Sequence, residues 1–451
     1  MFGGRAMEKA KLKKNILFNL ILFGFIGQIA WAVENIYFNT FLYNYIGATP
    51  KDISLMVALS AVTAVVTTFL MGTLSDKLNR RKIFLSGGYI LWGVTVMAFA
   101  LISRENVAGF FHLTDTAKVI TASVSVVIVM DCVMTFMGST SNDAAFNAWV
   151  TDVTVKENRG TAEGILATMP ILAMLIVTVA FGAGVSIAGY PACFIALGVL
   201  VTLCGVVGIF TVKDSRNGKK QNTNYWSDLI YGFRVSVVKE NKDLYLALAA
   251  TCVFNTATQI FMPYLFIYLQ HYLGFDFTKL QITPTVALIA VGGLIGFVAV
   301  IVLLGKLIDK RGKDKFIYPA VIIFMLGLMF VYFAKSLLVF ALCALVMLIG
   351  YGLLMIILNA SVRDFTPTDK VGQFQGIRMI FFVLIPMVLG PAIGNATIEM
   401  FAKNYSLGTM VNEFGETTLV PIPTVFLAAS IVSLLIFIPI FVMKKRQKNR
   451  T

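Results

Sequence analysis

Two carboxylates inside long apolar runs are the residues of this 451-residue chain best suited to chemistry. Glu34 lies a little past the middle of the apolar run 15–46, and Asp131 lies near the middle of the run 118–149. A charged side chain at the centre of a membrane-spanning helix costs about 2.5–3.5 kcal/mol on insertion scales, so such a residue indicates function. Burial in an apolar medium disfavours the charged form of a carboxyl group, which predicts reversible protonation at both positions. The alternative is a neutral carboxyl group that joins two helices by a hydrogen bond.

Amides and an indole accompany Glu34 along the first apolar run. In a helix, Gln28, Asn35 and Asn39 fall on one face, and Trp31 adjoins that face. Amide groups both donate and accept hydrogen bonds, and an indole ring can stack on a sugar ring. This stripe therefore predicts a binding site for a hydroxyl-rich solute, with Glu34 to one side as a proton carrier.

A polar face also continues from Asp131, because Thr135, Gly138 and Asn142 follow it at i+4, i+7 and i+11. This pattern favours a proton-carrying role for Asp131 over a role in packing alone.

The second half of the chain carries a smaller polar group in the apolar run 244–272. Asn255 and Gln259 lie four residues apart, and Pro263 removes a backbone donor and permits a kink. We expect Asn255, Gln259 and Tyr264 to complete the solute site from this half.

Neither a catalytic site nor a metal site is indicated. The five cysteines lie in apolar runs without a CxxC pair, and the two histidines, His112 and His271, are far apart. The sequence has no nucleophile with a neighbouring base and no Walker-type loop. We therefore expect a protein that is not an enzyme, binds no metal or other cofactor and does not use ATP directly.

The composition requires a membrane around the elements that position these residues. Hydrophobic residues make up 58% of the chain and charged residues 13%, with a mean hydropathy of +0.83. Because about 20 apolar residues span the hydrocarbon core, we predict an all-α polytopic membrane protein with twelve transmembrane helices. They are expected at 15–46, 52–74, 82–103, 118–149, 161–185, 190–211, 244–272, 282–304, 316–334, 337–358, 373–400 and 422–443.

The basic residues predict the orientation. All but six of the 37 Lys and Arg residues fall in the two tails and in the even-numbered connections. This positive-inside asymmetry places both termini in the cytoplasm of a multi-pass protein of the cell membrane. The net charge of +14 then faces anionic lipid headgroups, and nucleic acid is not expected as a partner. We expect the chain to act as a monomer.

The longest polar connection divides the chain into three parts. We predict an N-terminal six-helix bundle over 1–211, a cytoplasmic linker over 212–243 and a C-terminal six-helix bundle over 244–451. Within the linker, Trp226, Leu229, Ile230 and Phe233 fall on one face, which predicts a short amphipathic helix at the membrane surface.

Three sets of residues recur between the two halves at a similar displacement, which predicts two parallel six-helix repeats. The sets, each given as first copy and second copy, are Gly72, Asp76, Arg80 and Arg81 with Gly305, Asp309 and the basic run to Lys313; Ala148, Asp152, Gly160 and Gly164 with Ala360, Asp364, Gly372 and Gly376; and Tyr45-Ile-Gly47 with Tyr272-Leu-Gly274.

The layout of twelve helices in two halves, the long middle connection and the loop from Gly72 to Arg81 resemble the major facilitator superfamily. Within it, Trp31 and Glu34 in the first helix and the run Gly372-Gln-Phe-Gln-Gly-Ile-Arg378 resemble the sugar–cation symporters of the glycoside–pentoside–hexuronide and sucrose-type branches. The resemblance implies a membrane transporter built from two bundles.

Two features of related branches are missing. The second predicted helix has no carboxylate between Ile53 and Leu74, whereas melibiose-type carriers are expected to have sodium-binding aspartates there, which argues against sodium coupling through that helix. The fifth contains Pro170 but not the Gly-Pro-x-x-Gly-Gly run of drug antiporters, which weakens a drug efflux interpretation.

Charged residues near one end of the predicted helices are expected to form gates. The resemblance implies that Asp76 pairs with the guanidinium group of Arg80 or Arg81 as a latch that closes the cytoplasmic side. Asp309 holds the same place in the second loop. Arg378 can hold an anionic solute, pair with a carboxylate, or extend to the headgroups. The alternative is a set of solvated loop ends that only satisfy the positive-inside rule.

The second pair of matched loops predicts two further latches. Asp152 is expected to pair with Arg159, and Asp364 is expected to pair with Arg363 or Lys370.

The leading hypothesis is a secondary active transporter that alternates access to a central site. Its solute is expected to be small, neutral and polar, such as a sugar or glycoside, and a proton carried by Glu34 and Asp131 is the expected coupling ion, with sodium left open. The alternative is an exporter of amphipathic drugs or lipids in the same fold. The 37 Phe and 20 Met residues do not decide between these functions, because most of them must pack or face lipid.

Overall fold

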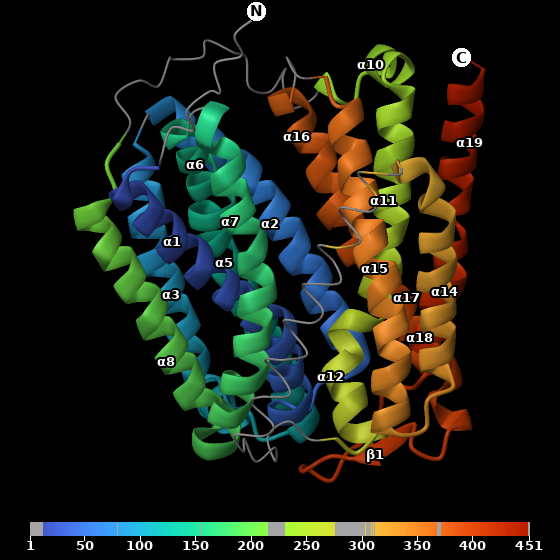
Figure 1. The fold of residues 1–451 in the computed structure, drawn as a ribbon. Coiled ribbons are helices and arrows are strands. Elements are labelled where there is room, and N and C mark those ends of the chain that lie inside the picture. The colour runs from blue at the N-terminus through green and yellow to red at the C-terminus, as the bar shows by residue number, and fades with distance from the viewer. Residues whose placement is uncertain are drawn as a thin grey trace, which may run out of the picture. The chain divides into compact units, whose positions relative to one another are not determined.

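The computed structural model describes residues 12–78, 80–154, 156–214, 231–275, 303, 308, 310, 312–367 and 371–449. These residues form helices and one short antiparallel hairpin (Figure 1). Up to residue 211 the α-helices are α1 (Lys14–Val33), α2 (Pro50–Leu78), α3 (Gly88–Ala98), α4 (Arg104–Phe111), α5 (Thr116–Gly138), α6 (Asn147–Val153), α7 (Lys156–Ile176) and α8 (Gly182–Thr211).

After residue 231 the α-helices are α10 (Val235–Glu240), α11 (Lys242–Phe261), α12 (Leu265–Ile267), α14 (Ile317–Tyr332), α15 (Leu337–Phe365), α16 (Val371–Met379), α17 (Ile385–Phe401), α18 (Thr424–Leu434) and α19 (Phe437–Lys448). The hairpin joins β1 (Thr409–Val411) to β2 (Thr417–Leu419), with Met410 opposite Thr418.

Short π-helical and 3-10 segments continue several of these helices. The π-helical segments are Glu34–Phe38, Phe41–Tyr45, Ile83–Gly87, Ser139–Phe146, Val177–Phe181, Tyr268–Tyr272 and Ile380–Leu384. The 3-10 segments are Phe99–Leu101, Met262–Tyr264, Lys313–Lys315 and Ala402–Asn404. The 3-10 turn Met262–Tyr264 interrupts its helix at Pro263, where the missing backbone donor predicts a break.

Nine helices in the described part of the chain are long and apolar enough to cross a membrane. They are Lys14–Tyr45, Pro50–Ser75, Ile83–Leu101, Thr116–Val153, Ile165–Thr211, Lys242–Tyr272, Leu337–Phe365, Gly376–Asn404 and Thr424–Lys448, and the apolar helix Ile317–Tyr332 is shorter. The prediction of an all-α polytopic membrane protein is therefore confirmed.

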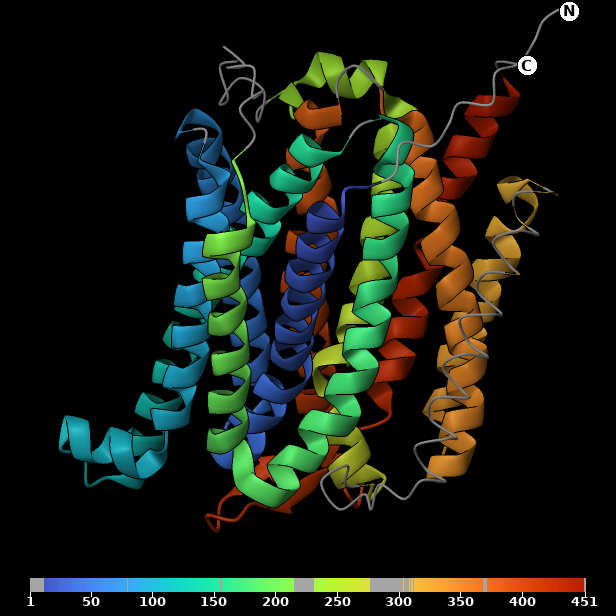
Figure 2. The same ribbon diagram turned by 60° about the vertical axis from the view of Figure 1, so that its left-hand side comes forward.

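One long apolar segment, Ile165–Thr211, covers most of the predicted helix 161–185 and all of the predicted helix 190–211. The chain turns back within this segment (Figure 2). At Gly189 the backbone is not helical, with a φ of 78° and a ψ of 170°. Glycine tolerates this positive φ because it has no Cβ. Of the predicted helix 282–304 only residue 303 is described, and the other predicted helices fall on described residues, so the described helices are consistent with twelve.

The chain divides into two compact units. The first consists of Met1–Ile46 and Val62–Asn222, and the second of Gly47–Ala61 and Thr223–Thr451. The beginning of α2 thus groups with the second unit. The division predicted from the sequence, with a linker at 212–243, stays a prediction.

The first unit has its tightest helix contact between α3 and α8. A Cβ atom added at Gly93 would lie 2.4 Å from the carbonyl oxygen of Gly198, and one added at Gly198 would lie 2.5 Å from the carbonyl oxygen of Gly93. The two backbones can approach this closely only because both residues lack a side chain.

The second unit uses glycine in the same way between α14 and α15. A Cβ atom added at Gly350 would lie 2.3 Å from the backbone nitrogen of Phe324. At one end of this unit, Val237 of α10 packs into an apolar cluster with Phe374 and Ile377 of α16 and Met443 of α19. The described end of the linker is therefore anchored to the second unit, whereas Trp226, Leu229 and Ile230 lie outside the described residues.

The backbone repeats where the sequence predicts it. Gly47 and Gly274 both have positive φ, 81° and 70°, and each follows a π-helical segment. In each segment two rings four residues apart stack, Phe41 on Tyr45 and Tyr268 on Tyr272, with centroids 5.2 Å apart in both pairs. Matched residues thus build the same helix end twice.

Candidate functional site

The carboxyl group of Glu34 lies against the helix that carries Asp131. Oε1 of Glu34 accepts a hydrogen bond from Oγ1 of Thr135 at 3.3 Å. Asp131 lies one turn before Thr135 on α5, and each of these two residues is only 1% exposed. Both carboxyl groups lie within electrostatic range of the Cys132 side chain, so the two acids share one region of the first unit.

A hydroxyl group next to a carboxyl group suits proton exchange. Thr135 can donate to the carboxylate form of Glu34 and can accept from its protonated form. The contact can therefore persist in both protonation states.

The Trp31 indole is part of a hydrogen-bonded chain that crosses three helices. Its Nε1–H donates to Oδ1 of Asn142 at 3.2 Å, and Nδ2 of Asn142 donates to the hydroxyl of Tyr89 at 2.7 Å. The Tyr89 hydroxyl donates to the carbonyl oxygen of Phe23 at 2.6 Å. The ring of Trp92 packs 5.0 Å from the Trp31 ring, centroid to centroid.

The three predicted amides of the first helix differ in their surroundings. Asn35 is exposed and donates from Nδ2 to the carbonyl oxygen of Trp31 at 2.7 Å. Asn39 is buried and donates to the carbonyl oxygen of Asn35 at 2.9 Å. Gln28 is half-buried, and no hydrogen bond joins it to another described residue. Gln28 and Asn35 are thus the two amides of the predicted stripe that remain partly or fully accessible.

In the second unit, the predicted residues contact the helix formed by α16 and α17. Nδ2 of Asn255 donates to the carbonyl oxygen of Phe382 at 3.0 Å, and the side chain of Gln259 packs on Gly390. Tyr264 is fully buried. Its hydroxyl lies 2.8 Å from the carbonyl oxygen of Pro391 and 3.2 Å from that of Pro50. In this conformation, Tyr264 joins backbone segments of the second unit and has no surface to offer a solute.

The two halves differ in the residues that could carry a proton. Aligned on the matched Tyr-x-Gly motifs, the position of Glu34 is occupied by Phe261 in the second half. Aligned on Asp152 and Asp364, the position of Asp131 is occupied by Cys343.

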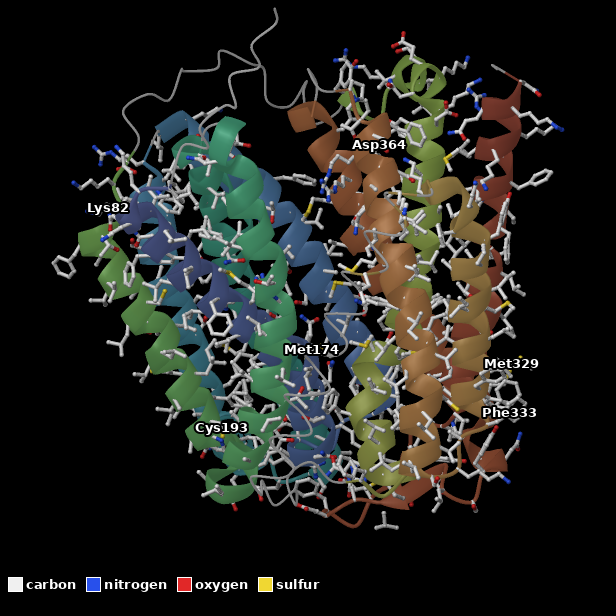
Figure 3. The ribbon with its side chains drawn as sticks, viewed as in Figure 1. Lys82, Met174, Cys193, Met329, Phe333 and Asp364 are labelled. Carbon is white, nitrogen blue, oxygen red and sulfur yellow. The ribbon has the colours of Figure 1, made fainter. Side chains whose placement is uncertain are left out.

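The described latch of the first unit joins two different loops. Nε of Arg81 lies 3.1 Å from Oδ2 of Asp152, and Nη1 of Arg81 donates to Oγ of Ser75 at 2.6 Å. The backbone N–H of Lys82, labelled in Figure 3, donates to Asp214 at 2.8 Å. The described partner of Asp152 is therefore Arg81, 71 residues away, in place of the expected Arg159, whose side chain lies outside the described structure.

The second unit repeats this ion pair. Nζ of Lys313 lies 2.5 Å from Oδ2 of Asp364 at the end of α15 (Figure 3). Lys313 lies in the second copy of the loop that runs from Gly72 to Arg81 in the first half. Each ion pair therefore joins its copy of this loop to the end of the next-but-one predicted transmembrane helix. The expected partners were Arg363 and Lys370, of which Lys370 lies outside the described residues.

The remaining predicted gate residues are Arg80, Asp76, Asp309 and Arg378. Arg80 is exposed beside the first latch, and the side chain of Asp76 lies outside the described structure, as does Asp309. Arg378 is exposed, and its guanidinium carbon lies 4.9 Å from the centroid of the Phe382 ring. Three roles were predicted for Arg378. Its cation–π contact with Phe382 is compatible with the third, in which the arginine extends to the lipid headgroups.

The first latch is expected to affect transport rate more than stability. Arg81→Gln removes a partly exposed ion pair worth less than about 1 kcal/mol. We expect a severalfold lower initial uptake rate in proteoliposomes and little change in apparent Tm. Lys77→Gln, at an exposed position in the last turn of α2, is the control and should retain the wild-type rate. Equal losses in both variants would contradict a specific role for the Arg81–Asp152 pair.

The sequence matches the family model described as Major Facilitator Superfamily over residues 20–391 and 298–451. The chain belongs to the Major Facilitator Superfamily. It is a multi-pass membrane transport protein and not an enzyme. No curated protein matches this sequence.

Solved structures of two transporters share the fold of this superfamily member. The nucleoside transporter NupG is 12% identical, with a TM-score of 0.65, over 95% of this chain and 98% of that chain. A bacterial homolog of the human lysosomal transporter Spinster, in an inward-facing and occupied conformation, is 12% identical, with a TM-score of 0.70. That match covers 97% of this chain and 98% of the homolog.

Sequence reasoning missed Tyr89, Trp92 and Gly27. Tyr89 and Trp92 are three residues apart on α3, fully buried, and surrounded in sequence by apolar residues. Their spacing shows that they share a helical face but carries no information about which helix that face meets. Gly27 adjoins Gln28, and its role is visible only from the side chains packed against it.

Proposed function

We propose that this transporter is a secondary active symporter that moves a small neutral polar solute, such as a sugar or glycoside, together with a proton. The observation that carries the proposal is the hydrogen bond between Glu34 and Thr135, one turn from Asp131. It brings together the two carboxylates at membrane depth that the sequence singles out. Each carboxylate carries an insertion cost, so two of them one helical turn apart at this contact favour a functional role.

Coupling is confined to the first unit in this proposal. The positions equivalent to Glu34 and Asp131 in the second half are Phe261 and Cys343, neither of which can exchange a carboxyl proton. One half then carries the proton, while Asn255 and Gln259 of the other half contribute polar groups to the solute.

The solute class follows from the polar groups available. Gln28 and Asn35 present amide groups that can donate to and accept from hydroxyl groups, and Trp31 presents an indole. Few formal charges accompany them, which favours a neutral solute. Alternating access would be controlled by the Arg81–Asp152 and Lys313–Asp364 pairs, with the termini in the cytoplasm of the cell membrane.

The direct test is proton uptake by proteoliposomes that contain a pH-sensitive dye. Pooled neutral saccharides are added outside, first without an ion gradient and then with a sodium gradient. An influx of protons that depends on saccharide supports the proposal, and dividing the pool then identifies the solute. If the folded protein gives no proton influx, proton–saccharide symport is wrong. Uptake driven by a sodium gradient alone would identify sodium as the coupling ion in place of the proton. Efflux of an amphipathic dye would favour the exporter.

A further inference from the structure

We propose that Asn142 and Tyr89 are positioning residues that hold the Trp31 indole in one orientation toward the solute. The inference rests on the proposed function, which places Trp31 at the solute. It adds two residues outside the predicted solute stripe, one on α3 and one in the π-helical segment that follows α5.

The hydrogen bonds run in one direction along the chain. An indole nitrogen only donates, so Trp31 requires the oxygen of Asn142. The amide nitrogen of Asn142 must then donate to Tyr89, whose own hydrogen goes to the carbonyl oxygen of Phe23. Each group is used in one sense only, so a flipped amide of Asn142 would place two donors against each other at Trp31. The hydrogen bonds therefore fix one orientation of the Asn142 amide, with its oxygen toward the indole N–H of Trp31.

This series of hydrogen bonds begins and ends on the first helix, α1. Trp31 and Phe23 lie eight residues apart on α1, slightly more than two turns. Between them the hydrogen bonds pass through Asn142 and Tyr89, so three helices of the first unit contribute. A shift of α3 relative to α1 would therefore change the position of the Trp31 acceptor.

Glycines provide the space that the chain requires. A Cβ atom added at Gly27 would lie 2.2 Å from Nδ2 of Asn142 and 2.6 Å from the hydroxyl of Tyr89. A Cβ atom added at Gly138 would lie 2.9 Å from the Trp31 ring and 2.8 Å from the Trp92 ring. Gly27 leaves space for the hydrogen bond between Asn142 and Tyr89, and Gly138 leaves space for the Trp31 ring. A side chain at either position would disturb the environment of Trp31.

The expected consequence is a change in solute affinity without loss of turnover. Removing the Tyr89 hydroxyl leaves the Asn142 amide without its acceptor, so the amide can rotate and release the indole. A neutral hydrogen bond has a modest net effect, which corresponds to about a two- to tenfold rise in KM. The rate of the transport cycle should stay the same, because neither residue carries the proton.

The first test is spectroscopic and needs no solute. The chain has four tryptophans, so 5-fluorotryptophan labelling gives four ¹⁹F resonances, and Trp31→Phe assigns one of them. Tyr89→Phe and Asn142→Ala should each move the Trp31 resonance. Tyr37→Phe is the matched control, since the Tyr37 hydroxyl also donates to a backbone carbonyl, that of Thr178, at 2.9 Å. If the Trp31 resonance stays in place in both test variants, the proposal is wrong.

The second test measures transport of the identified solute. Tyr89→Phe should raise KM with Vmax unchanged, and it should have no further effect in a Trp31→Phe background. A KM that is unchanged while the resonance moves would overturn the link to the solute. If the wild type transports no saccharide, the symport proposal fails instead, and the resonance shifts alone decide whether Asn142 and Tyr89 position the indole.

Discussion

Asp131→Asn is expected to abolish accumulation of solute against its gradient and to leave solute exchange in place. Asparagine has nearly the same shape as aspartate but cannot take up and release a proton. Without protonation, the inward proton gradient contributes no driving force, so the internal solute concentration should only reach the external one. Exchange of labelled for unlabelled solute requires no net proton movement and should continue. Both quantities are measured in proteoliposomes with an imposed pH gradient.

Glu34→Gln is expected to give the same separation of accumulation from exchange. Thr135 provides a finer test, because Thr135→Val removes the hydroxyl that contacts Glu34 and keeps the shape of the side chain. We expect weaker accumulation in Thr135→Val, and Thr135→Ser should retain it.

The matched control for these variants is Asp143→Asn. Asp143 is a carboxylate three turns further along the same helix, where it accepts a hydrogen bond from Ser139 at 2.8 Å. It has no part in the proposed proton site, and accumulation should survive its replacement. Undiminished accumulation in both Glu34→Gln and Asp131→Asn would rule out proton coupling through these residues.

Adding one methyl group at Gly93 is expected to destabilise the first unit, whereas adding one at Gly87 should not. The added carbon at Gly93 would lie 2.4 Å from a backbone oxygen and 2.5 Å from a backbone nitrogen of α8. Backbone atoms cannot move aside as a flexible side chain can, so the helices must separate. Overpacking of this kind costs about 1–3 kcal/mol.

Gly87→Ala is the matched control, because Gly87 lies six residues earlier in the same transmembrane helix and no described atom lies within 4 Å of its added carbon. Replacing glycine by alanine in a helix with open space is favourable by about 0.5–1 kcal/mol. The two variants should therefore shift the apparent Tm in opposite directions.

Thermal unfolding in detergent can be followed with a thiol-reactive dye. Cys193 and Cys204 of α8 are buried free cysteines that become reactive when α8 separates from its neighbours. Gly93→Ala should lower the temperature at which the dye reacts. If Gly93→Ala and Gly87→Ala unfold at the same temperature, the close approach of α3 and α8 is not a source of stability.

The two halves of the chain share helix ends and ion pairs but differ in their carboxylates, and this difference has a physical reason. The repeat preserves what both halves need, namely helix ends such as those at Gly47 and Gly274 and ion pairs at Asp152 and Asp364. It does not preserve the carboxylates, which are costly in a membrane and are retained where they serve a function. Helix ends and ion pairs are thus duplicated, whereas the two carboxylates of the proposed proton site occur in the first half alone at these matched positions.

The partners of the loop carboxylates could not be predicted from the sequence. Basic and acidic residues at matched positions indicated latches, and the expected partners were neighbours in sequence such as Arg159. The described partner, Arg81, is 71 residues from Asp152. Charge attracts charge regardless of separation along the chain, so the partner is decided by which helix ends are adjacent in the fold.

The same limit applies inside the helices. The stripe containing Trp31 and Asn35 followed from helical periodicity, and the face of Asp131 followed from the same rule. Periodicity states which residues of one helix share a face, but not which residue of another helix meets that face. Tyr264 shows the difference: periodicity does not reveal that packing buries this side chain completely in the present conformation, and its solute contact stays a prediction.

The sequence by itself determined that this chain is a helical membrane protein, where most of its helices lie and that its halves repeat. Hydropathy, helix length and loop charge are local properties that add up along the chain, so they can be read without knowing the fold. Only the tertiary structure decided that Thr135 meets Glu34, that Tyr89 supports Trp31 through Asn142 and that Gly27 must lack a side chain. These contacts depend on the rotation and separation of packed helices, which are set by the shapes of many side chains together.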